Sequence, residues 1–283
     1  GLEPPARARG HGRIPGPQDL ASILFTSGTT IAPKGVMLSH GNFVANVRAV
    51  AEFLEASPED RFLSVLPLHH VFEFTCGLLT PLWIGARTTY LLSLGSPQIS
   101  AAMQERAITV LLGVPRLYQL LAQGIEARIA AAGPIAQGAA RLLARLAART
   151  GTRVRRALFR RVHRALGGRV RVLISGGAPL DAELYDRFRS MGFVLCEGYG
   201  LTETAPVLTV NPPDRTRRGS VGLPLPGVDL QIVGADGDGV GEIVVKGPNV
   251  MRGYLGQPEL TASTLRDGWL HTGDLGRLDA DGF

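Results

Sequence analysis

The sequence predicts an α/β protein that ends in a smaller β-rich subdomain. Apolar runs of strand length alternate with amphipathic segments of helical length from residue 20 to residue 210, which is typical of an α/β sheet. Past Asn211 the pattern changes to short strands separated by turn pairs, as at residues 236–239. The chain has 283 residues, of which 45% are hydrophobic and 19% charged, so a disordered or collagen-like protein is excluded.

Three segments are expected along the chain. Residues 1–60 end a first α/β subdomain, residues 61–210 form a second one with an Arg-rich helical insert over 121–168, and residues 211–283 form the β-rich subdomain. The periodicity of apolar residues and the positions of turn-forming residues predict each element. In chain order these are strands 20–25 and 36–38, helix 42–54, strand 62–66, helix 71–83, strands 88–92 and 109–112, helix 115–129, and strands 170–174, 193–196, 229–233 and 242–246.

The basic character of the chain is concentrated in one place. The net charge is +6, yet from Arg141 to Arg171 there are eleven arginines and no acidic residue, which leaves 19 basic against 24 acidic residues elsewhere. Arg141, Arg145 and Arg149 lie four residues apart on one helical face, with leucines on the other. After a break at Gly151, a second helix is expected to carry the apolar stripe Val154, Leu158, Val162 and Leu166.

These arginines fit either a solvated helical hairpin or a basic amphipathic surface that contacts an anionic membrane. A nucleic-acid partner is not expected, because no base-reading or aromatic-interleaved motif accompanies them.

Cys76 and Cys196 stand inside apolar runs and are predicted to be free thiols. Residues 1–18 lack the apolar core of a secretory signal. We therefore expect a cytoplasmic protein, with peripheral contact at the inner face of a membrane as an option.

Three polar clusters stand where strands are expected to end. The first is Thr26-Ser27-Gly28-Thr29-Thr30, followed by Lys34; its hydroxyls, backbone N–H groups and cation suit a polyphosphate. It is not a Walker A loop, because Pro33 and Gly35 interrupt that spacing. A threonine-rich turn without a ligand is the alternative.

The second cluster runs from Glu197 to Thr204. Glycines on both sides of Tyr199 let its ring lie against a planar ligand, and Glu203 offers a carboxylate to a hard cation. A capped turn, with Thr202 or Thr204 at a helix start, is the alternative. The third cluster is His271-Thr272-Gly273-Asp274. A carboxylate after a strand commonly accepts ribose hydroxyls, but an ordinary loop has the same composition.

Together, in this order, the motifs TSGTT, PKGV, YGLTET and TGD resemble the adenylate-forming superfamily of acyl-CoA synthetases, luciferases and peptide-synthetase adenylation domains. The segments LPLHHVFE at 66–73 and SGGAPL at 175–180 extend the resemblance to about residues 20–283. The Arg-rich insert resembles that of long-chain fatty-acyl members. The resemblance implies the central part of that family's large domain, with stacked sheets flanked by helices.

The resemblance also implies a reaction. A long-chain fatty acid attacks ATP to give an acyl-adenylate, and coenzyme A then displaces AMP; ATP, Mg²⁺ and coenzyme A are the implied cofactor and co-substrates. Two alternatives stay open, an acyl-AMP ligase that loads a carrier protein and a noncatalytic nucleotide- or lipid-binding module. The family's C-terminal domain, with its catalytic lysine, is expected to lie outside this sequence.

By the same resemblance, Thr26, Ser27, Gly28, Thr29, Thr30 and Lys34 cradle the β- and γ-phosphates, and Glu203 holds Mg²⁺ with Thr26. Adenine is framed by Gly177, Ala178, Gly198 and Tyr199, while Thr202 meets the α-phosphate and Asp274 the ribose. His70 is placed beside the carboxylate, so the implied catalytic set is His70, Lys34, Thr202 and Glu203. A core histidine at His70 and core packing of Phe74, otherwise a gate to the acyl tunnel, are the alternatives. Ile31 departs from the family, which has glycine there.

Overall fold

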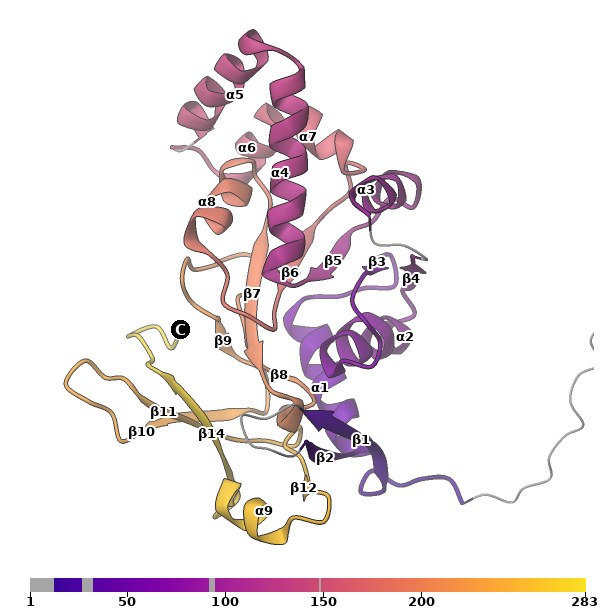
Figure 1. The fold of residues 1–283 in the computed structure, drawn as a ribbon, viewed down its shortest axis with the longest axis vertical. Coiled ribbons are helices and arrows are strands. Elements are labelled where there is room, and N and C mark those ends of the chain that lie inside the picture. The colour runs from indigo at the N-terminus through magenta and orange to yellow at the C-terminus, as the bar shows by residue number, and fades with distance from the viewer. Residues whose placement is uncertain (1–12, 27–32, 92–94, 148) are drawn as a thin grey trace, which may run out of the picture.

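The computed structural model describes residues 13–26, 33–91, 95–147 and 149–283. Ser27, Gly28, Thr29, Thr30 and Ile31 of the expected phosphate loop lie outside the described residues. The described chain forms three sheets with helices packed around them (Figure 1). The predicted α/β fold class is confirmed.

The largest described sheet has seven strands in the order β4-β3-β5-β6-β7-β8-β9. Strands β4, β3, β5, β6 and β7 run parallel, β8 is antiparallel to β7, and β9 is antiparallel to β8. Strand β7 runs past its expected end at residue 196, because its glycines pair with β8. The bounds are β3 Arg61–Ser64, β4 Arg87–Tyr90, β5 Val110–Gly113, β6 Val172–Ser175, β7 Leu195–Gly200, β8 Val207–Val210 and β9 Leu223–Pro224.

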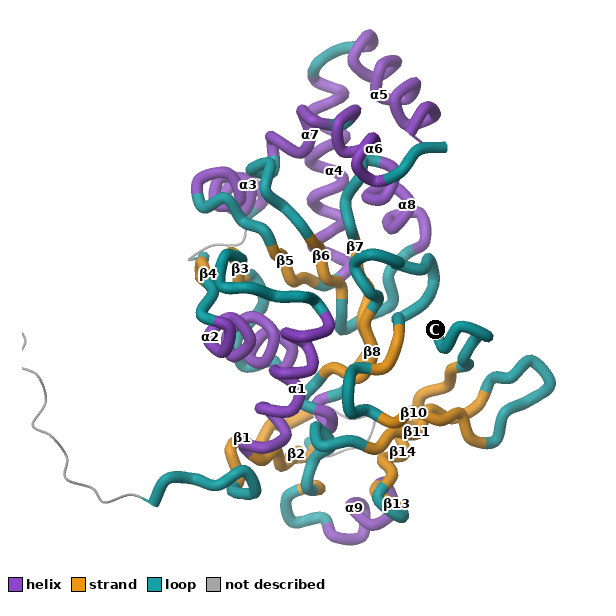
Figure 2. Tube along the Cα trace, turned by 180° about the vertical axis from the view of Figure 1, so that it is seen from behind, coloured by secondary structure: helices purple, strands orange, loops and turns teal. Residues whose placement is uncertain are grey.

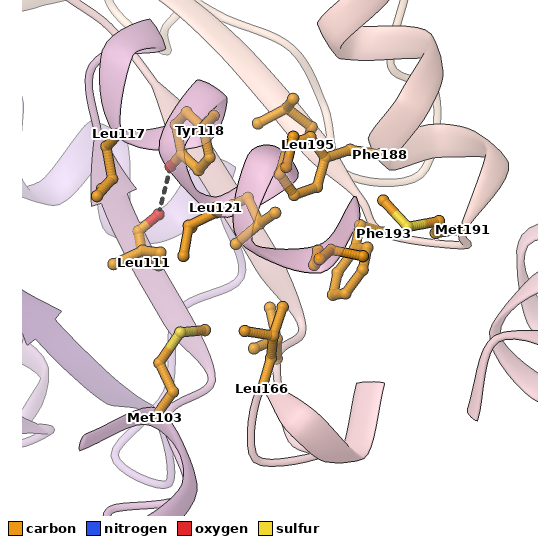
Figure 3. Packing of buried hydrophobic residues seen from close by; sticks show 14 of the residues in the cluster. Met103, Leu111, Leu117, Tyr118, Leu121, Leu166, Phe188, Met191, Phe193 and Leu195 are labelled. Atoms are coloured by element: carbon orange, nitrogen blue, oxygen red, sulfur yellow. Dashed lines mark hydrogen bonds between the residues drawn. The ribbon is translucent and has the colours of Figure 1, made fainter. Parts of the chain in front are cut away.

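Alternate residues of the central strands face opposite sides of this sheet, as the pleat of a strand requires. Leu111 and Leu173 pack in a cluster with α3 (Ser96–Glu105), α4 (Pro115–Ala131) and α8 (Ala182–Ser190). Their neighbours Val110 and Val172 pack on the other side with α1 (His40–Phe53). Figure 3 shows Tyr118 of α4 reaching back to the sheet, where its hydroxyl donates to the Leu111 carbonyl at 3.0 Å.

One predicted helix is replaced by two elements of different winding. The π-helix η1 (Glu73–Leu79) and the short helix α2 (Thr80–Ile84) occupy the place of the single helix expected at 71–83. A π-turn contains more residues than an α-turn, so it shifts the side chains that follow onto a different face.

The Arg-rich insert forms α5 (Pro134–Ala147), α6 (Thr152–Leu158) and α7 (Arg160–Ala165) at one end of the molecule, beside α4 (Figures 1 and 2). The break at Gly151 occurs as predicted, but the expected stripe is interrupted at Phe159, where α6 ends. Val154 is therefore half exposed, at 50%, whereas Leu166 is buried. In the described part of the chain no helix is long and apolar enough to cross a membrane. The membrane contact through Arg141–Arg171 stays a prediction.

The remaining sheets join the ends of the chain. Strands β1 (Leu20–Thr26) and β2 (Lys34–Ser39) form a hairpin, and β12 (Gly253–Tyr254) pairs with β2 as a third strand. A strand from residues 211–283 thus joins a sheet formed by residues 1–60. The other sheet has the order β10-β11-β14-β13. Its strands are β10 Asp229–Val233, β11 Gly241–Lys246, β13 Leu265–Arg266 and β14 Trp269–Gly276, with α9 (Pro258–Thr264) beside them. The division at residues 60 and 210 stays a prediction, although β9 and β12 cross it.

A partly buried ion pair between Asp60 and Arg171 joins elements at the amino-terminal ends of strands in the large sheet. The Asp60 carboxylate accepts two bonds from the Arg171 guanidinium, at 3.1 and 2.7 Å, and one from the Thr109 hydroxyl at 2.7 Å. Arg171 also donates to the Leu54 carbonyl at the end of α1. Burial alone would raise the pKa of Asp60, but Arg171, Thr109 and the Ser57 N–H together hold that pKa below its usual value. This ion pair therefore ties α1 to β3, β5 and β6.

We expect Asp60→Asn to lower the free energy of unfolding at pH 7 by about 2 kcal/mol, because it leaves a partly buried guanidinium without its counter-charge. Since the pKa of Asp60 is lower in the folded state, its contribution is present above pH 4 and fades as the pH falls further. Urea denaturation at pH 7 and pH 3 measures both effects. The control is Asp19→Asn, which breaks the exposed pair with Arg13; equal losses in the two variants would contradict the prediction.

Candidate functional site

A cavity of about 500 Å³ opens at the carboxyl ends of the central parallel strands. Residues just after β5 and β6 and the glycine-rich end of β7 line it, together with side chains of α1 and η1. Ligands of open α/β sheets commonly bind at this edge. Of the predicted site residues, the cavity brings together His70, Gly177, Gly198, Tyr199 and Thr202.

The two ends of the cavity differ in chemistry. Val50 of α1, Leu54 directly after that helix, Phe62 of β3 and Leu112 of β5 give it an apolar wall. Polar atoms gather at the glycine-rich strand ends and at Thr202. Among the described lining residues there is no Asp, Glu, Lys or Arg. The cavity can therefore bury an apolar body, with the polar end of a ligand at the strand ends.

The strand ends that form this polar part are held close to the ligand space. Gly177 has a φ of +79°, a backbone conformation that favours glycine. The neighbouring Ala178 is exposed and does not line the cavity. Glu197, buried on β7, accepts a hydrogen bond from the Leu180 N–H at 2.8 Å, and burial raises the pKa of Glu197. It thereby anchors the 176–180 loop to β7, a positioning role that the sequence analysis did not assign.

Tyr199 and Asp274 meet across two sheets. The Tyr199 hydroxyl donates to Asp274 Oδ2 at 2.6 Å, and burial together with this carboxylate raises the pKa of Tyr199. Asp274 was expected after a strand but lies within β14. The pairing of β14 with β11 slips between Glu242 and Val244, and Gly273 has a φ of +75°. This irregularity re-aims the strand locally.

Glu203 and Lys34 are joined through one tyrosine. The Tyr254 hydroxyl donates to Glu203 Oε1 at 2.9 Å, and Lys34 Nζ lies 5.5 Å from the centre of the Tyr254 ring. Thr26 pairs directly with Lys34 across the β1–β2 hairpin. Neither Thr26, Lys34 nor Glu203 lines the cavity, but Glu203 directly follows the lining residue Thr202. The remaining predicted phosphate-loop residues, Ser27 to Thr30, lie outside the described residues.

Glu203 fits a magnesium ion only in part. In the described ranges no three His, Cys, Asp or Glu side chains gather as a metal site. Mg²⁺ commonly takes one or two carboxylates and completes its shell with water and substrate phosphates. A single carboxylate next to Thr202 therefore fits an ion that arrives with a nucleotide, and it does not fit a resident metal.

Two buried asparagines hold the turn that carries Thr202 and Glu203. Asn249 donates to the Thr204 carbonyl at 2.8 Å, and Asn46 of α1 donates to the Val207 carbonyl at 2.7 Å. Each amide also reaches the other carbonyl at longer range. Neither asparagine was predicted to belong to the site, since nothing near them in the sequence marks one.

His70 lies exposed at the cavity and is not a core histidine. Its placement beside a carboxylate stays a prediction. Phe74 does not line the cavity; it packs edge-on against Phe43, with ring centres 5.4 Å apart. Phe72 lines it instead and also touches Gly176. Phe72 lies just before the π-helix that begins at Glu73 and four residues before the lining residue Cys76, whereas Phe74, two residues on, lies on another face of the helix.

Glu73 is fully buried beside the cavity wall. Neither of its carboxylate oxygens has a hydrogen-bond partner, and a Cβ at Gly77 would collide with them. Burial raises the pKa of Glu73 to about 7; the Ser64 hydroxyl and Leu66 N–H oppose this shift from nearby without reaching hydrogen-bond geometry. A carboxyl group therefore titrates near neutral pH one residue from the lining Phe72.

Known proteins resemble the whole described fold. AMP-binding enzymes match residues 3–255. A feruloyl-CoA synthase of Amycolatopsis sp is 32% identical, covering 95% of this chain and 49% of that protein, and the Homo sapiens long-chain-fatty-acid–CoA ligase 1 is 36% identical, covering 93% and 40%. A malonyl-CoA ligase solved with methylmalonyl-CoA and AMP bound has a TM-score of 0.74 at 31% identity, covering 92% of this chain and 50% of that one. The chain thus spans half the length of these relatives or less.

Glu73→Gln is expected to flatten the pH dependence of stability. The pKa of Glu73 is about 7 in the folded state against 4.5 for an ordinary glutamate, so the parent should lose on the order of 3 kcal/mol of unfolding free energy between pH 4.5 and 7. The slope of that free energy against pH is the readout, because Gln also leaves buried polar atoms. The exposed Glu52→Gln on α1 should keep the parent slope. An unchanged slope in Glu73→Gln would show that this carboxyl ionises normally.

Proposed function

The chain belongs to the AMP-binding enzyme family, and we propose that the protein activates a carboxylic acid with ATP and passes the acyl group to coenzyme A. In the first step a carboxylate oxygen attacks the α-phosphorus, and the bond to pyrophosphate breaks. In the second step the coenzyme A sulfur attacks the acyl carbon, and the bond to AMP breaks. Positioning and charge neutralisation supply most of the acceleration in such transfers.

One observation carries this proposal: a single cavity has an apolar wall and a polar end built from Gly177, Gly198, Tyr199 and Thr202. An acyl-adenylate has the same two halves, an apolar chain and a nucleotide, joined at one carboxyl carbon. The cavity volume of about 500 Å³ lies within the usual range of ligand sites, about 300–1,000 Å³.

We propose a long-chain fatty acid as the substrate. The described lining holds no lysine or arginine, and a second carboxylate, as in malonate, would be buried there without a counter-charge. An apolar monocarboxylate avoids that cost. The apolar lining extends along α1 from Val50 to Leu54 and on to Ala56, which favours an extended chain. An aromatic acid such as ferulate is the alternative that this lining also accommodates.

We propose the other roles on the family resemblance, although Thr26, Lys34, Ala178, Glu203 and Asp274 lie outside the cavity lining. Thr26, Lys34 and the Ser27–Thr30 loop are proposed to hold the β- and γ-phosphates, with Thr202 at the α-phosphate. Glu203, with Thr26, would hold Mg²⁺, which neutralises phosphate charge when it is bound. Gly177, Ala178, Gly198 and Tyr199 frame adenine, and Asp274, already an acceptor for Tyr199, takes the ribose hydroxyls. His70 is proposed to donate to the substrate carboxylate.

A carrier protein as the acyl acceptor is the second candidate, because both acceptors would react with the same proposed acyl-adenylate. The two acceptors give different second steps but the same first one. Pyrophosphate exchange therefore tests adenylation alone, and thioester formation with coenzyme A then separates the two acceptors. A noncatalytic module would bind without either reaction.

Glu203→Gln in the full-length protein is expected to slow Mg²⁺-dependent pyrophosphate exchange at least about tenfold, or roughly 1.4 kcal/mol of barrier, because it removes an anionic ligand. Tyr254→Phe, which deletes the hydrogen bond to Glu203, should cause a smaller loss. The exposed Glu259→Gln on α9 is the matched control. Exchange at the parent rate in Glu203→Gln would overturn the role of Glu203.

Ala56→Trp is expected to shorten the acyl site without closing it to small acids. Ala56 lines the cavity just beyond α1 and is half-buried, so a larger side chain there removes space for an acyl chain. We expect kcat/KM to fall about tenfold or more for a 16-carbon acid and little for an 8-carbon acid. Ser57→Trp, at the next residue and outside the lining, is the control. Equal losses for both acids would place the chain elsewhere.

A further inference from the structure

A second cavity, of about 590 Å³, lies within the helical insert. Its walls come from the second half of α4, from α5, and from α6 and α7, with Ser100 of α3 at one side. These helices stand together at the end of the molecule remote from β12 and α9 (Figure 1). The cavity shares no lining residue with the first one, and Tyr118 and Leu173 of the buried core line neither cavity.

The lining of this second cavity is apolar with one kind of charge. Leu121 and Ile125 of α4, Ala140 of α5 and Val162 of α7 are typical of its wall. The charged residues in the described lining are Arg128, Arg160 and Arg161, and no acidic residue lines it. Across the described chain none of these three side chains makes a hydrogen bond or ion pair. All three residues are exposed, so water can reach these cations at the rim of the cavity. An anion with an apolar tail would match both the three cations and the apolar wall beside them.

Helix α5 covers the cavity only partly. Ala136, Ala140 and Leu143 line it, but Ala147 is the one buried residue described for this helix. Leu142 and Leu146, on the adjoining side of α5, are 58% and 56% exposed. The small alanines leave room between α5 and α4, and contacts that a filled core would supply are missing there. A flexible chain that enters between these helices would supply them.

We propose that this second cavity binds a free long-chain fatty acid anion, with the chain among α4, α5 and α7 and the carboxylate at Arg128, Arg160 and Arg161. Charge complementarity determines the head group, since a cationic amphiphile would meet three arginines. The volume, above that of the first cavity, suits a single chain. This site does not rest on the proposed reaction, because it shares no residue with the cavity proposed for catalysis.

Calorimetric titration with dodecanoate below its micelle concentration tests the site in the full-length protein. The double variant Arg160→Gln/Arg161→Gln should weaken binding about tenfold, by removing two charge-assisted contacts. Ala140→Phe should abolish the same binding event by filling the cavity. The matched control is Arg164→Gln/Arg169→Gln, which removes the same charge from exposed arginines outside the lining, and it should bind as the parent does. Dodecyltrimethylammonium should not bind.

The same titrations distinguish this site from the first cavity and from a membrane-binding surface. Ala56→Trp should change only a binding event at the first cavity. If the protein shows no adenylation, dodecanoate binding that depends on Arg160 and Arg161 should still be observed. Dodecanoate binding that is the same in parent, Arg160→Gln/Arg161→Gln and Ala140→Phe would overturn the second site. So would binding to phosphatidylglycerol vesicles without any binding of monomeric dodecanoate, which would make these helices a membrane surface instead.

Discussion

The candidate site depends on two asparagine side chains that connect parts of the chain far apart in sequence. Asn46 on α1 and Asn249 near the end of the chain both donate to the Thr204 and Val207 carbonyls. Thr204 directly follows Thr202 and Glu203, and Val207 begins the next strand, β8. A buried carbonyl without a donor costs about 1–3 kcal/mol, and each of these two carbonyls accepts from both asparagines, so the pair of amides supports this conformation of the turn. These hydrogen bonds therefore hold α1, the turn before β8 and the segment around Asn249 next to one another.

The same junction explains why the polar residues come from three sheets. Tyr199 on β7 binds Asp274 on β14, and Tyr254 on β12 binds Glu203 beside Lys34 on β2. Each contact pairs a tyrosine with a carboxylate, and each tyrosine has its pKa raised by burial and by its partner. A neutral phenol can hold a carboxylate in place without cancelling its charge. The carboxylates therefore stay available to hydroxyl groups or to a cation.

The strands and the polar residues that follow them could be predicted from the sequence, because apolar periodicity and turn-forming residues are local signals. It placed His70, Gly177, Gly198, Tyr199 and Thr202 in one site, and the structure gathers these around one cavity. It could not find that Phe72 and not Phe74 lines the cavity, since both stand in one apolar run and tertiary packing decides which face of that run meets the cavity. Asn46, Asn249 and Glu197 were missed for another reason. Their partners are set by tertiary packing, and an isolated Asn or Glu carries no local signature.

The two cavities place charge in opposite ways, and this difference bears on what each can hold. The first has no cation in its described lining, so an anion there must be met at the strand ends, by neutral donors and by the hairpin cation Lys34 beyond the lining. The second carries three arginines of its own and, in its described lining, no other polar side chain but Ser100. A charge that must react is better placed among oriented donors that stabilise a transition state than among flexible cations that stabilise the resting carboxylate. The charge distribution of the first cavity therefore suits the proposed adenylation, and that of the second suits the proposed retention of an anion.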